Sequence, residues 1–124
     1  MADYKQFDII WALYPFSDMT EKSKPRPGII VSNDLSNSLD NDFLVCPITS
    51  KLREDMFSVV ITDEMLIIPL DLESEIRCNK IATIRQKLII NKISELLPEY
   101  HDKILEKINS AFDDGTIKSF SNNP

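Results

Sequence analysis

The sequence predicts a mainly β protein (α+β), a small barrel or roll that ends in one α-helix. Short apolar runs rich in β-branched and aromatic residues recur along most of the chain, and polar turn residues separate them. Apolar residues at clear helical spacing occur only near the C-terminus. The 124 residues suffice for one domain with its own core. We assign residues 1–115 to this domain and residues 116–124 to a polar tail.

The expected strands are apolar runs of strand length, over residues 7–14, 28–32, 43–48, 57–61, 65–70 and 76–84. Pro15 ends the first, because proline cannot continue a central ladder. A polar loop is expected over 16–27, and a turn region over 33–42 begins with Asn-Asp. Residues 88–93 fit a strand or a helix equally well by periodicity.

The clearest helix is predicted to begin near Pro98, since proline suits a first helical turn. Asp-Asp-Gly at 113–115 is expected to end it. Residues at three- and four-residue spacings form its apolar face: His101, Ile104, Leu105, Ile108, Ala111 and Phe112. The only histidine thus lies on a packing face, where we expect a structural role. A serine–histidine–acid hydrolase would need this imidazole, so that class is disfavoured.

Composition excludes several kinds of site. Glycine occurs only at positions 28 and 115, so no glycine-rich phosphate loop can be written. One histidine excludes the H-E-x-x-H motif, and two cysteines without C-x-x-C spacing exclude a thiolate zinc cage. We expect no metal and no cofactor. Without an export signal or a membrane-length apolar run, we expect a cytoplasmic protein with reduced cysteines and Cys46 in the core.

The net charge of −6 by itself disfavours nucleic acid, but the charges are unevenly placed. Ten of the fourteen basic residues lie in three windows, 22–26, 51–53 and 77–92, that contain no Asp or Glu. The remainder holds all 20 acidic residues and only four bases. If the fold brings the windows together, a basic face forms on an acidic body. Otherwise each window is a solvated loop.

Two short segments carry candidate chemistry. Arg26 stands between Pro25 and Pro27, which restrict its backbone to extended conformations. Its guanidinium is therefore pre-organised to bind a phosphate, and Gly28 allows close approach of another backbone. Residues 46–51, Cys-Pro-Ile-Thr-Ser-Lys, end an apolar strand in two hydroxyls and a cation, a group able to hold a phosphodiester.

Taken in order, several stretches resemble the MazF/PemK family of bacterial toxin endoribonucleases. Asp-Ile-Ile-Trp at 8–11, Arg-Pro-Gly-Ile-Ile-Val-Ser-Asn-Asp at 26–34 and Val-Cys-Pro-Ile-Thr-Ser at 45–50 carry the resemblance. Ile-Arg-Cys-Asn at 76–79, followed by Ile-Ala-Thr-Ile at 81–84, resembles a later strand of that family.

The resemblance, which runs from about residue 7 to residue 112, implies a fold, an activity and partners. The fold is an SH3-like β-barrel of the CcdB/PemK/MazF type with a C-terminal helix, assembled as a homodimer. The activity is metal-independent, sequence-selective cleavage of single-stranded RNA, in which a 2′-hydroxyl attacks the adjacent phosphate and leaves 2′,3′-cyclic phosphate and 5′-hydroxyl ends. The implied partners are the RNA and a cognate antitoxin with an acidic segment, with no membrane association.

The resemblance also implies site residues. Catalytic roles fall on Arg26 and Thr49, and the PemK branch adds Arg77. An aimed guanidinium and a hydroxyl stabilise the negative charge of a phosphorane-like transition state more than the ground state. The expected RNA-binding residues are Lys22, Lys24, Ser50, Lys51, Arg53, Asn79 and Lys80.

Three departures limit what can be transferred. Phe7 stands where many relatives have glycine, and residues 16–24 lack the family's Gly-x-Glu-Gln stretch. Asn79 replaces the PemK aspartate, and an amide cannot take a proton from a 2′-hydroxyl at neutral pH. The base therefore lies elsewhere, or the protein is a catalytically weakened RNA- or protein-binding barrel. A CcdB-like gyrase poison is a further alternative, although that family uses a C-terminal tryptophan and this chain has only Trp11.

Overall fold

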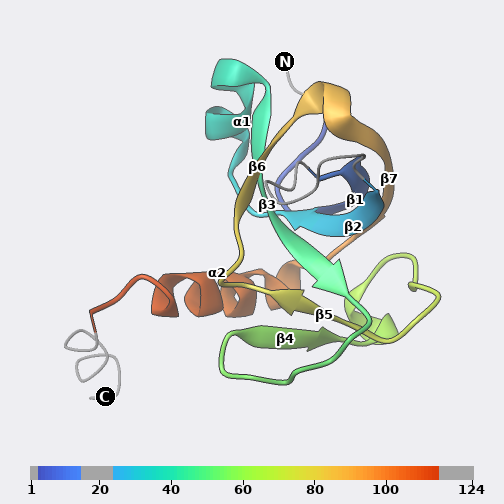
Figure 1. Ribbon diagram of the computed structural model, residues 1–124, viewed down its shortest axis with the longest axis vertical. Helices are drawn as coiled ribbons and strands as arrows, with labels where there is room; N and C mark the ends of the chain where they lie inside the picture. Colours follow the sequence, from blue (N-terminus) through green and yellow to red (C-terminus); the bar gives the residue numbers. More distant parts are fainter. Residues whose placement is uncertain (1–2, 15–23, 115–124) are drawn as a thin grey trace.

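The computed structural model describes residues 3–14 and 24–114. Over these residues the chain forms an antiparallel sheet with two α-helices (Figure 1), so the predicted mainly β fold with a C-terminal helix is confirmed. The strands are β1 (Asp8–Leu13), β2 (Pro25–Ile30), β3 (Asp42–Thr49), β4 (Ser58–Ile61), β5 (Ser74–Arg77), β6 (Ala82–Arg85) and β7 (Ile89–Glu95). The helices are α1 (Asp34–Asp40) and α2 (His101–Ser110), with 3₁₀ helices η1 (Asp63–Met65), η2 (Gln86–Leu88) and η3 (Pro98–Tyr100).

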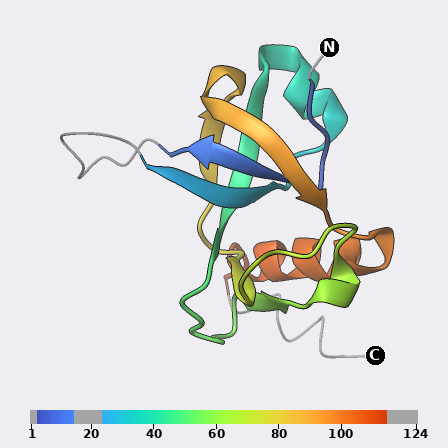
Figure 2. The ribbon, with the colours of Figure 1, turned by 90° about the vertical axis from the view of Figure 1, so that its right-hand side faces the viewer.

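Strand β3 extends through the sheet and changes partners along its length (Figures 1 and 2). Residues 42–45 pair with β6, whereas residues 48–49 pair with β5. Pro47 lies between these two stretches, and a proline cannot donate a ladder hydrogen bond. The strand order is β4-β5-β3-β2-β1-β7, with β6 also on β3, so among the described residues the sheet is an open, bent barrel.

Two apolar clusters lie on the two faces of the bent sheet. Alternation along β1 and β2 sends Ile9 and Ile29 to one cluster and Ile10 and Ile30 to the other. Helix α2 contributes the fully buried Ile104 to the first cluster, beside the shorter strands (Figure 2). Among the described residues, no helix has the length and apolar character needed to cross a membrane.

The two cysteines lie in the first cluster as free, buried thiols. Burial raises the pKa of Cys46 to about 12, with Cys78 adding to the shift, and burial raises the pKa of Cys78 to about 11. The predicted core role of Cys46 is confirmed, and both thiols are protonated at neutral pH.

The predicted structural role of His101 is also confirmed. Its ring stacks on Phe7 with ring centroids 3.7 Å apart, and its Nε2 lies 3.0 Å from the carbonyl oxygen of Leu96. Phe7 itself has φ 72°, a left-handed conformation that favours glycine. A glycine, which the family resemblance implies at this place, would adopt that conformation at lower cost.

The expected turn region over 33–42 contains a helix instead. Asn33 caps α1 by accepting the backbone N–H of Ser36 at 2.9 Å, and Asn41 ends it with φ 56°. Within α1 only Asn37 is buried, so no apolar stripe marks this helix in the sequence.

The prediction of a strand over 65–70 is wrong. Within this run only Leu66 forms a strand-type bridge, to Leu96. Ile68 bonds instead to a side chain, since Ser94 Oγ accepts its N–H at 3.1 Å and donates to its carbonyl oxygen at 2.7 Å. A serine hydroxyl therefore satisfies the backbone groups that a ladder would otherwise pair.

Other boundaries shift by a few residues. Strand β2 begins at Pro25, inside the expected loop over 16–27, and the expected strand over 76–84 divides into β5 and β6 at a turn. The ambiguous run over 88–93 belongs mostly to β7. Helix α2 ends at Ser110, and Phe112 is 73% exposed, so its predicted place on the packing face is wrong. Predictions for Pro15, Lys22 and the tail lie outside the described residues.

Candidate active site

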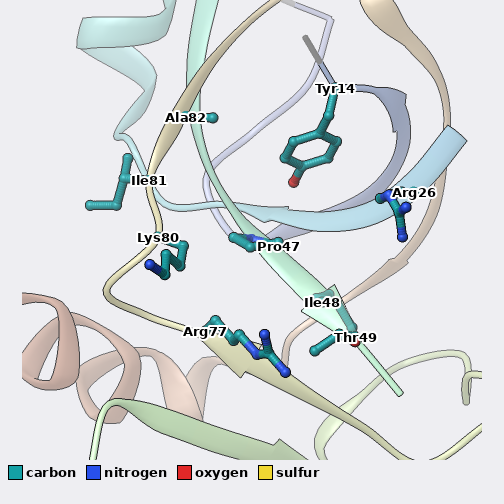
Figure 3. A pocket seen from close by; sticks show the side chains of 9 residues that line it. All are labelled: Tyr14, Arg26, Pro47, Ile48, Thr49, Arg77, Lys80, Ile81 and Ala82. Atoms are coloured by element: carbon teal, nitrogen blue, oxygen red, sulfur yellow. The ribbon is translucent and has the colours of Figure 1, made fainter. Parts of the chain in front are cut away.

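Arg26, Thr49 and Arg77, predicted as the catalytic residues, line one hollow of about 440 Å³ (Figure 3). They come from β2, β3 and β5, which are distant in sequence. The rest of the lining is Tyr14, Pro47, Ile48, Lys80, Ile81 and Ala82. Five lining side chains carry hydrogen-bond donors, and the described lining contains no Asp, Glu or His. Such a hollow suits an anion such as a phosphodiester.

The strand register explains why these side chains meet. Thr49 is the last residue of β3 and Arg77 the last residue of β5, and Ile48 pairs with Ile76 between them. Arg26 lies on the extended start of β2, where flanking prolines stiffen the strand. The partner change of β3 near Pro47 thus brings three strand ends to one hollow.

Thr49 presents its hydroxyl proton to other groups. The backbone N–H of Lys51 donates to Thr49 Oγ1 at 3.1 Å. A hydroxyl has one proton and two acceptor positions, so this contact uses an acceptor position and leaves the O–H as a donor. A phosphate oxygen in the hollow is a fitting acceptor for it.

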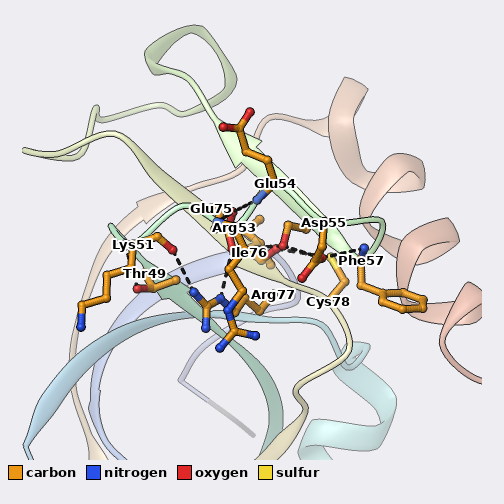
Figure 4. A network of polar contacts seen from close by, with 11 residues as sticks. Thr49, Lys51, Arg53, Glu54, Asp55, Phe57, Glu75, Ile76, Arg77 and Cys78 are labelled. Atoms are coloured by element: carbon orange, nitrogen blue, oxygen red, sulfur yellow. Dashed lines mark hydrogen bonds and ion pairs between the residues drawn. The ribbon is translucent and has the colours of Figure 1, made fainter.

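Arg77 is held at two points. Its Nε donates to Glu75 Oε2 at 3.1 Å, and its Nη2 donates to the carbonyl oxygen of Lys51 at 2.8 Å (Figure 4). A guanidinium carries five N–H donors, so donors remain for a ligand. Its side chain is 17% exposed, so much of it is already ordered before any ligand binds.

Glu75 is a buried carboxylate that the sequence analysis missed. It is 0% exposed, and Oε1 accepts the backbone N–H groups of Arg53 at 2.9 Å and Glu54 at 3.0 Å. Oε2 accepts Ser58 Oγ at 3.0 Å as well as Arg77 (Figure 4). Burial alone would raise the pKa of Glu75, but these donors outweigh it and hold that pKa below its usual value.

Tyr14 is a second residue that the sequence analysis missed. Its ring lies over Gly28, where an added Cβ would come within 2.1 Å of Tyr14 Oη and 2.6 Å of Val45 Cγ1. The close approach expected at Gly28 is therefore made by the backbone carbonyl of Cys46, 3.1 Å from the same position, and more tightly by these two side chains. Burial, with a smaller contribution from Cys46, raises the pKa of Tyr14 well above its usual value, so the phenol is neutral.

A second hollow of about 340 Å³ adjoins the first. Arg26, Ile48 and Thr49 line both hollows, and Ser50 lines only the second. The remaining lining is mostly apolar: Trp11, Pro27, Leu70, Asp71, Leu72, Ser74 and Ile93. The arginine–threonine pair thus stands between a basic hollow, which holds Arg77 and Lys80, and a second hollow, which holds Trp11 and Asp71.

The predicted RNA-binding residues lie at different distances from this pair. Lys80 lines the first hollow. Asn79, the residue before Lys80, is exposed on a turn. Lys51 and Arg53 are exposed on the loop that follows β3, beside Arg77, and Lys24 is exposed just before β2. Among the described basic residues of the expected windows, Arg26, Arg77 and Lys80 line the first hollow.

The end of the third window does not reach the hollow. Arg85 lies opposite Asp42 at the far end of β6, and Lys92 pairs with Asp8 and Glu95. Of the two alternatives left open by the sequence, a shared basic face does not include Arg85 or Lys92. Two acids neutralise Lys92, which the sequence pattern did not reveal.

The fold and the site define a class: a small antiparallel barrel that places arginines and a hydroxyl around an anion-sized hollow. The chain matches the family of PemK-like, MazF-like toxins of type II toxin–antitoxin systems over residues 5–112. It belongs to that family, as the sequence resemblance predicted. No curated protein matches the sequence.

Solved structures share this fold. The Mycobacterium tuberculosis toxin MazF-mt6 is 24% identical with a TM-score of 0.68, over 86% of this chain and 96% of that one. MazF from Deinococcus radiodurans is 15% identical with a TM-score of 0.69, over 87% and 96%. A mycobacterial endoribonuclease in complex with its cognate antitoxin is 18% identical with a TM-score of 0.69, over 87% and 93%.

Proposed function

We propose that this toxin-family protein is a metal-independent, sequence-selective endoribonuclease that cleaves single-stranded RNA. The observation that carries the proposal is the convergence of Arg26, Thr49 and Arg77 on one hollow free of acidic side chains among its described lining residues. The family match and the similarity to a mycobacterial endoribonuclease support it. Residues 1–115 are the proposed toxin domain.

The reaction follows from where negative charge develops. The RNA 2′-oxygen forms a bond to the adjacent phosphorus, its proton passes to water, and the bond to the 5′-oxygen breaks. That 5′-oxygen takes up a proton from water, so the products are a 2′,3′-cyclic phosphate and a 5′-hydroxyl. Arg26, Arg77 and the Thr49 hydroxyl stabilise the charge on the non-bridging oxygens. Asn79 has no part in the proton transfer, because its amide is not basic.

We expect the nucleosides on either side of the cleaved phosphate to occupy the two hollows. The phosphate lies at Arg26 and Thr49, which both hollows share. One flanking nucleoside enters the basic hollow beside Lys80, and the other enters the second hollow beside Trp11. Exposed Lys24, Lys51 and Arg53, together with Lys22, contact the phosphates beyond them, while Ser50 and Asn79 hydrogen-bond the flanking nucleotides.

A long single-stranded transcript incubated in EDTA tests the function. We expect cleavage by the wild type with 5′-hydroxyl ends, and a loss of about 10²- to 10³-fold in Arg26→Ala and in Thr49→Val. Lys87→Ala, at the far end of the sheet, is the matched control and keeps full activity. No cleavage by the wild type, or equal cleavage by Arg26→Ala, would contradict the proposal. RNA binding without cleavage would favour the weakened-barrel alternative.

We also propose a cytoplasmic homodimer that binds a cognate antitoxin through an acidic segment over the basic hollow. The complex of the mycobacterial endoribonuclease with its antitoxin, and that of MazE with MazF from Deinococcus radiodurans, support the antitoxin as a partner. Light scattering is expected to give twice the monomer mass. Binding of an acidic peptide is expected to weaken as salt increases and to inhibit cleavage; salt-independent binding would argue against a shared hollow.

A further inference from the structure

A chain of contacts joins the buried Glu75 to the hydroxyl of Thr49. Glu75 holds Arg77 Nε, and Arg77 Nη2 in turn holds the carbonyl oxygen of Lys51 at 2.8 Å. The N–H of the same residue, Lys51, donates to Thr49 Oγ1 at 3.1 Å. Lys51 therefore contacts two of the three proposed phosphate ligands, Thr49 and Arg77, through its backbone, while its side chain stays exposed (Figure 4).

Glu75 also holds the loop that carries Lys51. Its Oε1 accepts two successive backbone N–H groups, those of Arg53 and Glu54. Glu54 has φ 51°, a left-handed conformation unfavourable for a residue with a side chain. Hydrogen bonds to a buried anion offset that cost, since charge-assisted hydrogen bonds are stronger than neutral ones. The carboxylate thus fixes the loop at 53–54 directly and at Lys51 through Arg77.

We propose that Glu75 is a positioning residue that sets Arg77 and Thr49 toward the cleaved phosphate. This inference rests on the proposed endoribonuclease function. Arg77 shares the hollow with Arg26 and Lys80, so cationic repulsion would turn its flexible side chain away in the absence of RNA. The negative charge of Glu75, fully buried behind Arg77, counters that repulsion before substrate binds.

The two oxygens of Glu75 have different partners: Oε1 accepts from the loop, and Oε2 accepts from Arg77. A variant that changes only the second contact therefore tests the positioning role separately from loop anchoring. In Glu75→Gln, the amide oxygen still accepts the N–H groups of Arg53 and Glu54. The amide nitrogen then faces Arg77 Nε, and two donors cannot bond to each other. The variant therefore keeps the loop anchored and loses the contact that orients Arg77. Glu75→Ala loses both.

The experiment measures kcat and KM on a short RNA with a single cleavage site, alongside thermal unfolding. We expect Glu75→Gln to lower kcat by about 10- to 100-fold with KM within about twofold, because misplacing a transition-state ligand affects kcat. Glu73→Gln, an exposed acid two residues away, is the matched control and should match the wild type. Arg77→Met and the double variant Glu75→Gln/Arg77→Met should have equal kcat, because Glu75 acts through Arg77.

The possible outcomes are distinguishable. Wild-type kcat in a folded Glu75→Gln variant, or fully additive losses in the double variant, would overturn the positioning role and leave the proposed function intact. A wild type that cleaves no RNA overturns the function, and the inference with it. If Glu75→Gln does not fold, Glu75→Asp replaces it: the charge stays, the reach shortens by one methylene, and a lowered kcat is again expected.

Discussion

Two buried acids of this protein each pair with a cation from the same basic window, 77–92. One pair leaves its cation able to bind a ligand, whereas the other neutralises it. Glu75 holds Arg77 at 3.1 Å, and Asp8 holds Lys92 at 3.3 Å. Lys92 also bonds to Glu95, so two carboxylates surround its ammonium group. Arg77 contacts one carboxylate and one carbonyl and keeps further N–H donors for the hollow.

The difference shows that the number and chemistry of the partners decide what a cation does. A guanidinium can be fixed by two of its five donors and still bind a planar anion with others, whereas a lysine ammonium has three donors in all. Arg77 is therefore oriented toward the hollow by its partners, while the charge of Lys92 is neutralised at the edge between β1 and β7.

The largest expected effect is the difference in activity and stability between variants of the two cations. Arg77→Met removes a transition-state ligand and leaves Glu75 buried without its cation. We expect a loss of about 10²-fold in kcat/KM and of about 3 kcal/mol in the free energy of unfolding. Lys92→Met should keep full activity and lose at most about 1 kcal/mol, because its side chain is 37% exposed. RNA cleavage and urea unfolding of both variants check this. Equal losses in the two variants would contradict it.

The two pairs should also differ in the pH range where each contributes. The pKa of Glu75 is lowered, because its hydrogen-bond donors outweigh burial, so its contribution is complete above the unfolded pKa and is lost in acid, below about pH 4. The pKa of Lys92 is raised, mainly by its hydrogen bond to Glu95, so its contribution is complete below about pH 10 and is lost above it.

Thermal unfolding across the pH range checks both signs. Glu75→Gln should flatten the acid decline in melting temperature without changing the alkaline one, and Lys92→Met should do the reverse. An acid decline in Glu75→Gln as steep as that of the wild type would show that Glu75 does not titrate as described.

The smallest expected effect compares cations near the hollow with cations far from it. Lys80→Ala and Lys51→Ala should each weaken RNA binding a few-fold and reduce the slope of log affinity against log salt by about 0.7. Arg85→Ala and Lys87→Ala should leave that slope unchanged. Titration with 2′-O-methyl RNA, which cannot attack its own phosphate, measures binding alone. Equal slopes for all four variants would mean that RNA does not distinguish the two ends of the sheet.

Local chemistry made Arg26 and Thr49 predictable, because flanking prolines and a strand end with two hydroxyls are visible in sequence. Glu75 was not predictable in the same way. Its partners Arg53 and Glu54 lie 22 and 21 residues away, and the residues next to Glu75 in the sequence carry no sign of them. Its two-residue spacing from Arg77 on one strand face was the only available signal.

The errors of the sequence analysis have the same origin. The run over 65–70 has strand-like composition, but Ser94, from a distant strand, satisfies the backbone of Ile68. Helix α1 depends on the Asn33 cap and buries only Asn37, so hydrophobic periodicity did not reveal it. In both segments polar side chains decide the structure, and a pattern of apolar residues does not record their contacts.

The sequence by itself determined the mainly β class, the family, and a chemistry limited to arginines and hydroxyls, because these depend on residue types and short-range spacing. Only the tertiary structure decided which cations reach the hollow, which are neutralised, and that Glu75 orients Arg77. Those outcomes depend on hydrogen bonds that join residues far apart in the chain, such as Arg77 and Lys51 at a separation of 26 residues. Such partners meet only when β3 changes from β6 to β5 beside Pro47.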